Sequence, residues 1–320
     1  MTDQTIPVLN LQDFTSGQHS AAFVDALGSA LSEVGFFTLT HHGVEQRIID
    51  AAYGAAEAFF ALPDSTKAQY DIANLNGQRG FTSFGKEHAK DSDAPDLKEF
   101  WHLGRERPTA HPVSYPQNIW PREVPQFHPV MATLFQQLEA CADSLMQACA
   151  QYLQQSPDFF KTQVAEGQTI LRVIHYPPIP GDVEPASQRA APHEDINLIT
   201  LLCEATTPGL ELLTREGEWL PVQTLPGHII VDTGDMLQAL SNGQLKSTTH
   251  RVVNPNSSRD RRFSMPFFVH PRPEFDLTPL PSCAKKPDSK PDGMPDGKPL
   301  FPTQTAGDYL QQRLKEIGLS

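Results

Sequence analysis

The chain has few cysteines, no long apolar run and no excess of basic residues. Its four cysteines, Cys141, Cys149, Cys203 and Cys283, form no CxxC pair, so the sequence indicates neither a cysteine-type zinc site nor a disulfide framework. No segment approaches about 18 consecutive apolar residues, the length of a membrane span. The polar start, followed by IPVLNL, lacks the basic and apolar regions of a signal peptide. We therefore expect a cytoplasmic protein with reduced thiols.

Acidic residues outnumber basic ones, with 38 Asp and Glu against 25 Lys and Arg, a net charge of −13. Surfaces that bind nucleic acid or anionic membranes need clustered Lys and Arg, so both partner classes are excluded. The expected partner is a small molecule. No coiled-coil heptad or repeated interface pattern appears, and we expect a monomer.

The pattern along the chain predicts a mainly β fold with flanking helices. Helical periodicity covers 21–34, 46–60, 131–153 and 306–317, and strands are predicted at 6–11 and 36–40. Short β-rich runs separated by turns follow from residue 168, which is typical of an antiparallel sandwich or barrel. We expect one structural unit with an α/β N-terminal region, 1–130, and a β core with a C-terminal helix, 131–320. Within it, 71–130 is predicted to be a wrapping loop region and 273–302 a mobile, low-complexity loop.

A His-x-Asp motif, His193 and Asp195, occurs in the sequence PHED. At a strand start its two side chains would share one face, because alternate strand residues do. The motif alone is weak, since twelve histidines give roughly one such pair by chance. His250 lies in another predicted strand, which a jelly roll can bring alongside. Two histidines and one carboxylate form a facial triad that leaves positions open for a co-substrate and dioxygen, which suits iron(II).

Arg262 and Ser264 are two residues apart on a predicted strand, so a guanidinium and a hydroxyl face one side and can clamp a carboxylate. Tyr176, in the strand LRVIHYPP, adds a possible hydroxyl donor. A triad beside a carboxylate clamp is what an iron-bound keto acid needs. For Arg262 alone, a surface salt bridge is the more common explanation.

These motifs, in their order along the chain, resemble the isopenicillin N synthase-like family of iron(II)- and 2-oxoglutarate-dependent oxygenases. The resemblance covers nearly the whole chain and is carried by IPVLNL, GFFTLTHHGV, RGFTSFG, NIWP, LRVIHYPP, PHEDINLITLL, HRVVNP, RFSMPFF and GDYLQQRL.

The resemblance implies a double-stranded β-helix (jelly-roll) core, with His193, Asp195 and His250 as iron ligands. It also implies that Arg262 and Ser264 bind the distal carboxylate of 2-oxoglutarate, with Tyr176 as an additional partner. The sequence departs from many relatives at Ile174, where they carry Asn. The implied reaction oxidises a C–H bond of a small molecule, by hydroxylation, desaturation or ring closure, and releases succinate and carbon dioxide.

Three alternatives stay open beside this interpretation. Isopenicillin N synthase itself uses iron and dioxygen without 2-oxoglutarate, and its substrate supplies all four electrons. A catalytically inactive binding protein of the same fold would be expected to lack a ligand, and none is missing here. A zinc hydrolase with the same ligands is less natural, because no HExxH motif occurs.

Several other residues are candidates for contact with the substrate. Arg79, Phe81 and Lys86 lie in a segment that could cover the iron site, with a plain turn as the more common explanation. Trp101 and His102 suit a small-molecule pocket, and core packing explains them equally well. Glu194, between the two ligands of the motif, is expected to point away from the metal.

Overall fold

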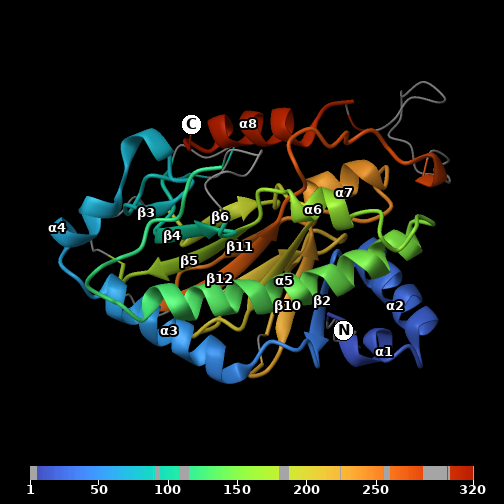
Figure 1. Ribbon diagram of the computed structural model, residues 1–320, viewed down its shortest axis with the longest axis horizontal. Coiled ribbons are helices and arrows are strands. Elements are labelled where there is room, and N and C mark those ends of the chain that lie inside the picture. The colour runs from blue at the N-terminus through green and yellow to red at the C-terminus, as the bar shows by residue number, and fades with distance from the viewer. Residues whose placement is uncertain are drawn as a thin grey trace.

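The structure, a computed structural model, describes residues 6–88, 90, 94–107, 115–179, 187–223, 225–255, 260–283, 301 and 303–319. Among these residues two β-sheets form the centre of the molecule (Figure 1). One has eight strands in the order β1-β2-β10-β7-β12-β5-β4-β3, and the other has four in the order β6-β11-β8-β9. The strands are β1 (Val8–Asn10), β2 (Phe36–Thr40), β3 (Gly80–Thr82), β4 (Glu99–Gly104), β5 (Ile170–Tyr176), β6 (Ala190–His193), β7 (Ile199–Cys203), β8 (Leu210–Leu213), β9 (Trp219–Pro221), β10 (Ile229–Thr233), β11 (His250–Val252) and β12 (Arg262–Val269).

The two sheets face each other and form the expected jelly roll. Phe36 and Ile230 from the large sheet pack with Leu210 and Leu212 from the small one. All pairings are antiparallel except β1 with β2. Because β1 and β2 come from the N-terminal region and extend the large sheet, that region is continuous with the core.

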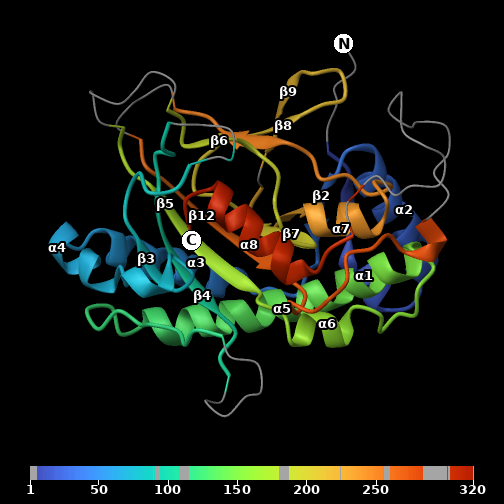
Figure 2. The same ribbon diagram turned by 90° about the horizontal axis from the view of Figure 1, so that it is seen from above.

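Helices cover the outer face of the large sheet. The 26-residue α5 runs along this face, and α2 and α3 pack against it (Figure 1). α8 lies on the opposite side, across β5, β7 and β12 (Figure 2). The helices are α1 (Leu11–Thr15), α2 (Ser20–Glu33), α3 (Gln46–Phe60), α4 (Asp64–Lys67), α5 (Phe127–Tyr152), α6 (Lys161–Ala165), α7 (Asp235–Leu240) and α8 (Ala306–Glu316), with 3-10 turns at Ala68–Tyr70, Ala73–Leu75 and Pro281–Cys283.

The predicted strand 36–40 and helix 46–60 are confirmed at both ends. The main helix begins at Phe127, four residues before its predicted start, because Pro129 is tolerated in a first helical turn. The first strand ends at Asn10, whose side chain accepts a hydrogen bond from the backbone of Gln12 and so caps α1.

The prediction that 71–130 is only a wrapping loop region is wrong, because β3 and β4 lie within it and extend the large sheet. All six residues of β4 are buried, so the strand lacks the alternation of polar and apolar residues that marks a half-buried strand.

The four cysteines are free and buried. No helix in the described ranges is long and apolar enough to cross a membrane. Most of the predicted loop at 273–302 lies outside the described residues.

Candidate active site

His193 and His250 lie directly opposite each other on the antiparallel strands β6 and β11. His193 is the last residue of β6, and Asp195 lies two residues past the end of that strand. The expectation that the motif starts a strand is therefore wrong. The loop still returns Asp195 to the two histidines, because the backbone carbonyl of Asp195 accepts from the N–H of Asp235 and that of Asn197 from the N–H of Met236.

The possible ligand atoms of the triad converge. Asp195 Oδ1 lies 4.0 Å from His193 Nε2 and 3.8 Å from His250 Nε2. All three possible ligand atoms lie within 4.8 Å of one another, the only such group of histidines, cysteines or carboxylates found in the described part of the chain.

Local hydrogen bonds fix the tautomer of each histidine. His193 Nδ1–H donates to the carbonyl of Ala191 at 2.7 Å, and His250 Nδ1–H donates to that of Thr248 at 3.1 Å. Both Nε2 lone pairs therefore face Asp195. Burial is the largest cause that lowers the pKa of His193 to about 4, and the charge interaction with His250 is the second. The ring is therefore neutral at physiological pH, as a ligand must be. Two imidazoles and one carboxylate fit iron(II).

A cavity lies on one side of the triad, and the residues of the predicted clamp line it. Arg262 pairs across the sheet with Tyr176, and Ser264 pairs with Ile174. The guanidinium carbon of Arg262 lies 5.1 Å from the centre of the Tyr176 ring. The structure thus brings Arg262, Ser264 and Tyr176 together with the three triad residues as the lining of one cavity.

Arg262 is only 1% exposed, and its only described hydrogen bond joins Nε to the carbonyl of Thr207 at 3.1 Å. Its buried Nη1 has no partner among the described residues. A buried cation without a counter-charge is unfavourable. The residues present therefore fit a carboxylate such as that of 2-oxoglutarate.

Two family models match the chain. One, the N-terminal region of the non-haem dioxygenase in morphine synthesis, matches residues 6–123, and the other, the 2OG-Fe(II) oxygenase superfamily, matches residues 167–271. A 2-oxoglutarate-Fe(II) type oxidoreductase, hxnY of Emericella nidulans, is 30% identical over 97% of this chain and 89% of its own length. This chain belongs to the 2OG-Fe(II) oxygenase superfamily.

Solved structures agree with this assignment. A 2OG-Fe(II) oxygenase family protein of Caulobacter crescentus is 39% identical, with a TM-score of 0.83 over 97% of this chain and 98% of that one. A full-length Neurospora crassa protein, solved in complex with alpha-KG and thymine, is 25% identical, with a TM-score of 0.83 over 98% of both chains. The oxygenase is a 2-oxoglutarate-dependent dioxygenase that uses iron(II) and dioxygen. These relatives do not support the alternatives without 2-oxoglutarate or without catalysis.

The oxygenase contains a second buried arginine that the sequence did not reveal. Arg189 is 1% exposed, and its guanidinium carbon lies 5.8 Å from the centre of the Tyr176 ring. The pKa of Arg189 is lowered, chiefly by burial and then by the charge of Arg262. The Nε of Arg189 has no partner among the described residues. No motif surrounds this residue, so only the folded structure shows that two cations flank Tyr176.

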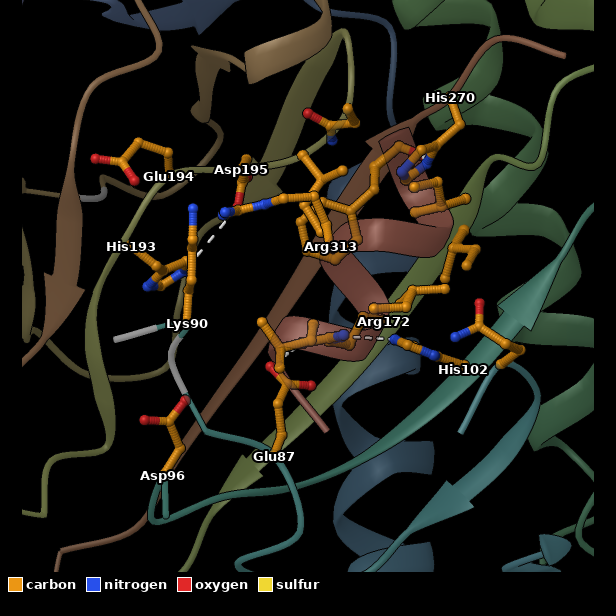
Figure 3. Close-up of a pocket in the computed structure, with 18 of the residues that line it drawn as sticks. Glu87, Lys90, Asp96, His102, Arg172, His193, Glu194, Asp195, His270 and Arg313 are labelled. Atoms are coloured by element: carbon orange, nitrogen blue, oxygen red, sulfur yellow. Dashed lines mark hydrogen bonds and ion pairs between the residues drawn. The ribbon is translucent and has the colours of Figure 1, made fainter. Parts of the chain in front are cut away.

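A second, larger chamber adjoins the triad of the oxygenase on its other side (Figure 3). It is lined by residues of β4, β5 and β12, of the segments next to them, and of α8. His193 and Asp195 line both cavities. Glu194 also lines the chamber, and its carboxylate accepts a hydrogen bond from Thr249.

Only one of the five candidate substrate contacts lines this chamber. His102 does, whereas Trp101 points to the other face of β4 and packs on Phe59 with ring centres 4.8 Å apart. Phe81 also packs on Phe59 in the core. The guanidinium of Arg79 lies under β4, where Gly104 leaves room for it. Lys86 is on the surface and binds Asp71 at 2.7 Å.

Proposed function

We propose that His193, Asp195 and His250 bind iron(II), and that Arg262, Ser264 and Tyr176 bind the distal carboxylate of 2-oxoglutarate. Bound iron(II) supplies dioxygen activation, in which 2-oxoglutarate becomes succinate and carbon dioxide and a substrate C–H bond becomes C–OH. One observation supports this proposal: two adjoining cavities share His193 and Asp195 in their lining, and His250 lines the first of them. The first cavity contains Arg262, whose Nη1 has no partner among the described residues, and the other is open to a second molecule.

The residues of this chain do the binding and orienting. Thr200 Oγ1 donates to Asp195 Oδ2, which leaves Oδ1 directed at the metal position. Asp232 also lines the co-substrate cavity, and burial, followed by the charge of Asp195, raises its pKa well above the ordinary value. Hydroxylation is the outcome we propose for the substrate.

The proposal extends to the protein as a whole. We propose a cytoplasmic monomer in which residues 1–130 and 131–320 are parts of one structural unit, acting on a small molecule and not on nucleic acid. The net charge of −13 supports the last point, because nucleic-acid surfaces are basic. Size-exclusion chromatography with light scattering tests the oligomeric state, and a mass of two chains would overturn the monomer.

Anaerobic titration tests the site directly. Iron(II) is added to the metal-free protein, followed by 2-oxoglutarate, and the visible charge-transfer band of a keto acid chelated to iron is recorded. We expect the band in the native protein and in Glu194→Gln, which changes the residue between the two ligands. We expect no band in His193→Ala or Asp195→Ala, because each lacks a ligand. A normal band in either ligand variant would refute the triad assignment.

A further inference from the structure

One wall of the substrate chamber is a buried network of four charged side chains, Glu87, Asp96, Lys98 and Arg172. Glu87 Oε1 lies 2.9 Å from both Lys98 Nζ and Arg172 Nη1, and Lys98 Nζ lies 2.8 Å from Asp96 Oδ2. Although burial opposes it, the charges of Arg172 and Lys98 lower the pKa of Glu87, so its carboxylate is ionised. Two cations and two anions balance each other in this wall.

Arg172 is held rigidly in the network (Figure 3). Its Nε donates to His102 Nε2 at 2.5 Å, and its guanidinium carbon lies 4.3 Å from the centre of the Phe100 ring. His102 Nδ1–H donates to the carbonyl of Gly77 at 2.6 Å, so Nε2 is free to accept. Burial, followed by the charge of Arg172, lowers the pKa of His102 well below its ordinary value and keeps the ring neutral. The guanidinium is therefore fixed before any ligand binds.

One nitrogen of this fixed guanidinium is left for a ligand. Nε and Nη1 of Arg172 have acceptors, whereas Nη2 has none among the described residues. The Nε2 of Gln78, which lines the same chamber, also has no acceptor in the described ranges. The wall thus presents two donors without an acceptor, beside one oxygen, Glu87 Oε2, that has no donor among the described residues. A substrate oxygen that accepts hydrogen bonds would satisfy the two donors.

The two cavities differ in their charge balance. In the chamber, Lys90 and Arg313 also have an acidic partner, Glu316, at 3.6 and 3.1 Å. In the co-substrate cavity, Arg262 donates to the backbone carbonyl of Thr207 and has no acidic side chain as partner among the described residues. An anion entering the co-substrate cavity meets unpaired positive charge, but an anion entering the chamber would be desolvated beside a wall that is already neutral.

We propose that the primary substrate is an uncharged small molecule whose carbonyl oxygen, as in an amide, lactam or imide, accepts from Nη2 of Arg172. Its apolar part packs against Phe268, Leu310 and Leu314, which line the same chamber, and its reacting carbon faces the triad. This inference rests on the proposed function, because it assumes that the chamber holds the molecule to be oxidised.

Calorimetry on the full chain loaded with manganese(II) and 2-oxoglutarate, without dioxygen, tests the proposal. The probes are matched pairs of neutral and anionic ring compounds, such as nicotinamide with nicotinate and uracil with orotate. We expect at least one neutral member to bind about tenfold or more tightly than its carboxylate. Tighter binding of the carboxylates, or no binding by any neutral member, overturns the proposal.

Two variants test the residues. Arg172→Lys removes Nη2 and is expected to weaken binding of the neutral probe by about ten- to hundredfold. Glu87→Gln leaves Arg172 without its counter-charge, so the preference should shift toward the carboxylate by about tenfold or more. Lys86→Gln, a surface substitution outside the chamber, should change neither the affinity for the neutral probe nor the preference between neutral probe and carboxylate. An unchanged preference in Glu87→Gln refutes the charge argument.

The binding of manganese(II) and 2-oxoglutarate is measured first in each sample. Retained binding shows that the variant is folded, so a failure with the probes then overturns the substrate class alone. If the native protein itself does not bind 2-oxoglutarate, the proposed function is overturned instead.

Discussion

Replacing Arg262 by Gln should weaken 2-oxoglutarate binding without unfolding the protein. The guanidinium is buried, has no acidic partner among the described residues and keeps only one hydrogen bond, from Nε to Thr207. Loss of a buried charge-assisted pair costs about 2–5 kcal/mol. At 1.4 kcal/mol for each tenfold change, the Kd of 2-oxoglutarate should rise by roughly 30- to 4,000-fold. Because the substitution also removes an uncompensated buried cation, the free energy of unfolding without co-substrate should fall little or rise.

Titration of 2-oxoglutarate into the manganese(II)-loaded protein measures this Kd, and denaturant unfolding of the metal-free protein measures stability. Arg261→Gln is the matched control, because Arg261 is the preceding residue on the chain and is exposed. A Kd within about threefold of the native value for Arg262→Gln, well short of the tenfold that 1.4 kcal/mol represents, would remove Arg262 from the site. Equal effects in both variants would mean that overall charge, and not the buried clamp, sets the affinity.

Three further predictions concern stability. Burial lowers the pKa of His270 from 6.5 to about 4, so below pH 6.5 the unfolded chain takes up a proton that the folded chain excludes. The free energy of unfolding should therefore fall by about 3 kcal/mol between pH 6.5 and 4. A pH series of unfolding measurements should show a shallower slope for His270→Gln. In Gly234→Ala the new Cβ would lie 2.2 Å from the Asn197 carbonyl oxygen, so the free energy of unfolding should fall by about 1–3 kcal/mol and metal binding should weaken. The control Gly54→Ala, at an open helical position, should raise the free energy of unfolding by about 0.5–1 kcal/mol. Similar thermal midpoints for the two variants would contradict this prediction. Manganese(II) at about 100 times its Kd should stabilise the native protein by about 2.7 kcal/mol and should not stabilise His193→Ala; a chelator should reverse the native shift.

The residues whose chemistry depends on local spacing were predictable from the sequence. Arg262 and Ser264 lie on one face of β12 because alternate strand residues do so. The triad was predictable in its members but not in its local geometry. Asp195 reaches the two histidines from a loop held by α7, and hydrogen bonds between distant backbone groups leave no periodic pattern in a sequence.

The residues that the sequence did not assign depend on long-range packing. Arg172 looks like an ordinary strand residue until β4 places His102 beside it, through the cross-strand pair His102↔Arg172. Trp101 and His102 were equal candidates for the pocket, and only the register of β4 decides which one faces it. Arg189 stands in no motif, and only the fold brings it to the Tyr176 ring, against which Arg262 also lies.

The pair of strands β5 and β12 contributes residues to the lining of both cavities of the oxygenase. Tyr176 and Arg262 are paired at one end, where the co-substrate is expected to bind, and Ile170 and Phe268 are paired toward the other, in the substrate chamber. Arg172 lies four residues from Tyr176 on the same strand face, about 13 Å along the strand. Because Ile170 lines the substrate chamber and not the co-substrate cavity, substitutions at Ile170 should change the choice of substrate while the Kd of 2-oxoglutarate stays the same. An effect of Ile170→Ala on 2-oxoglutarate binding as large as that of Arg262→Gln would show that the two sites are not separable along this strand pair.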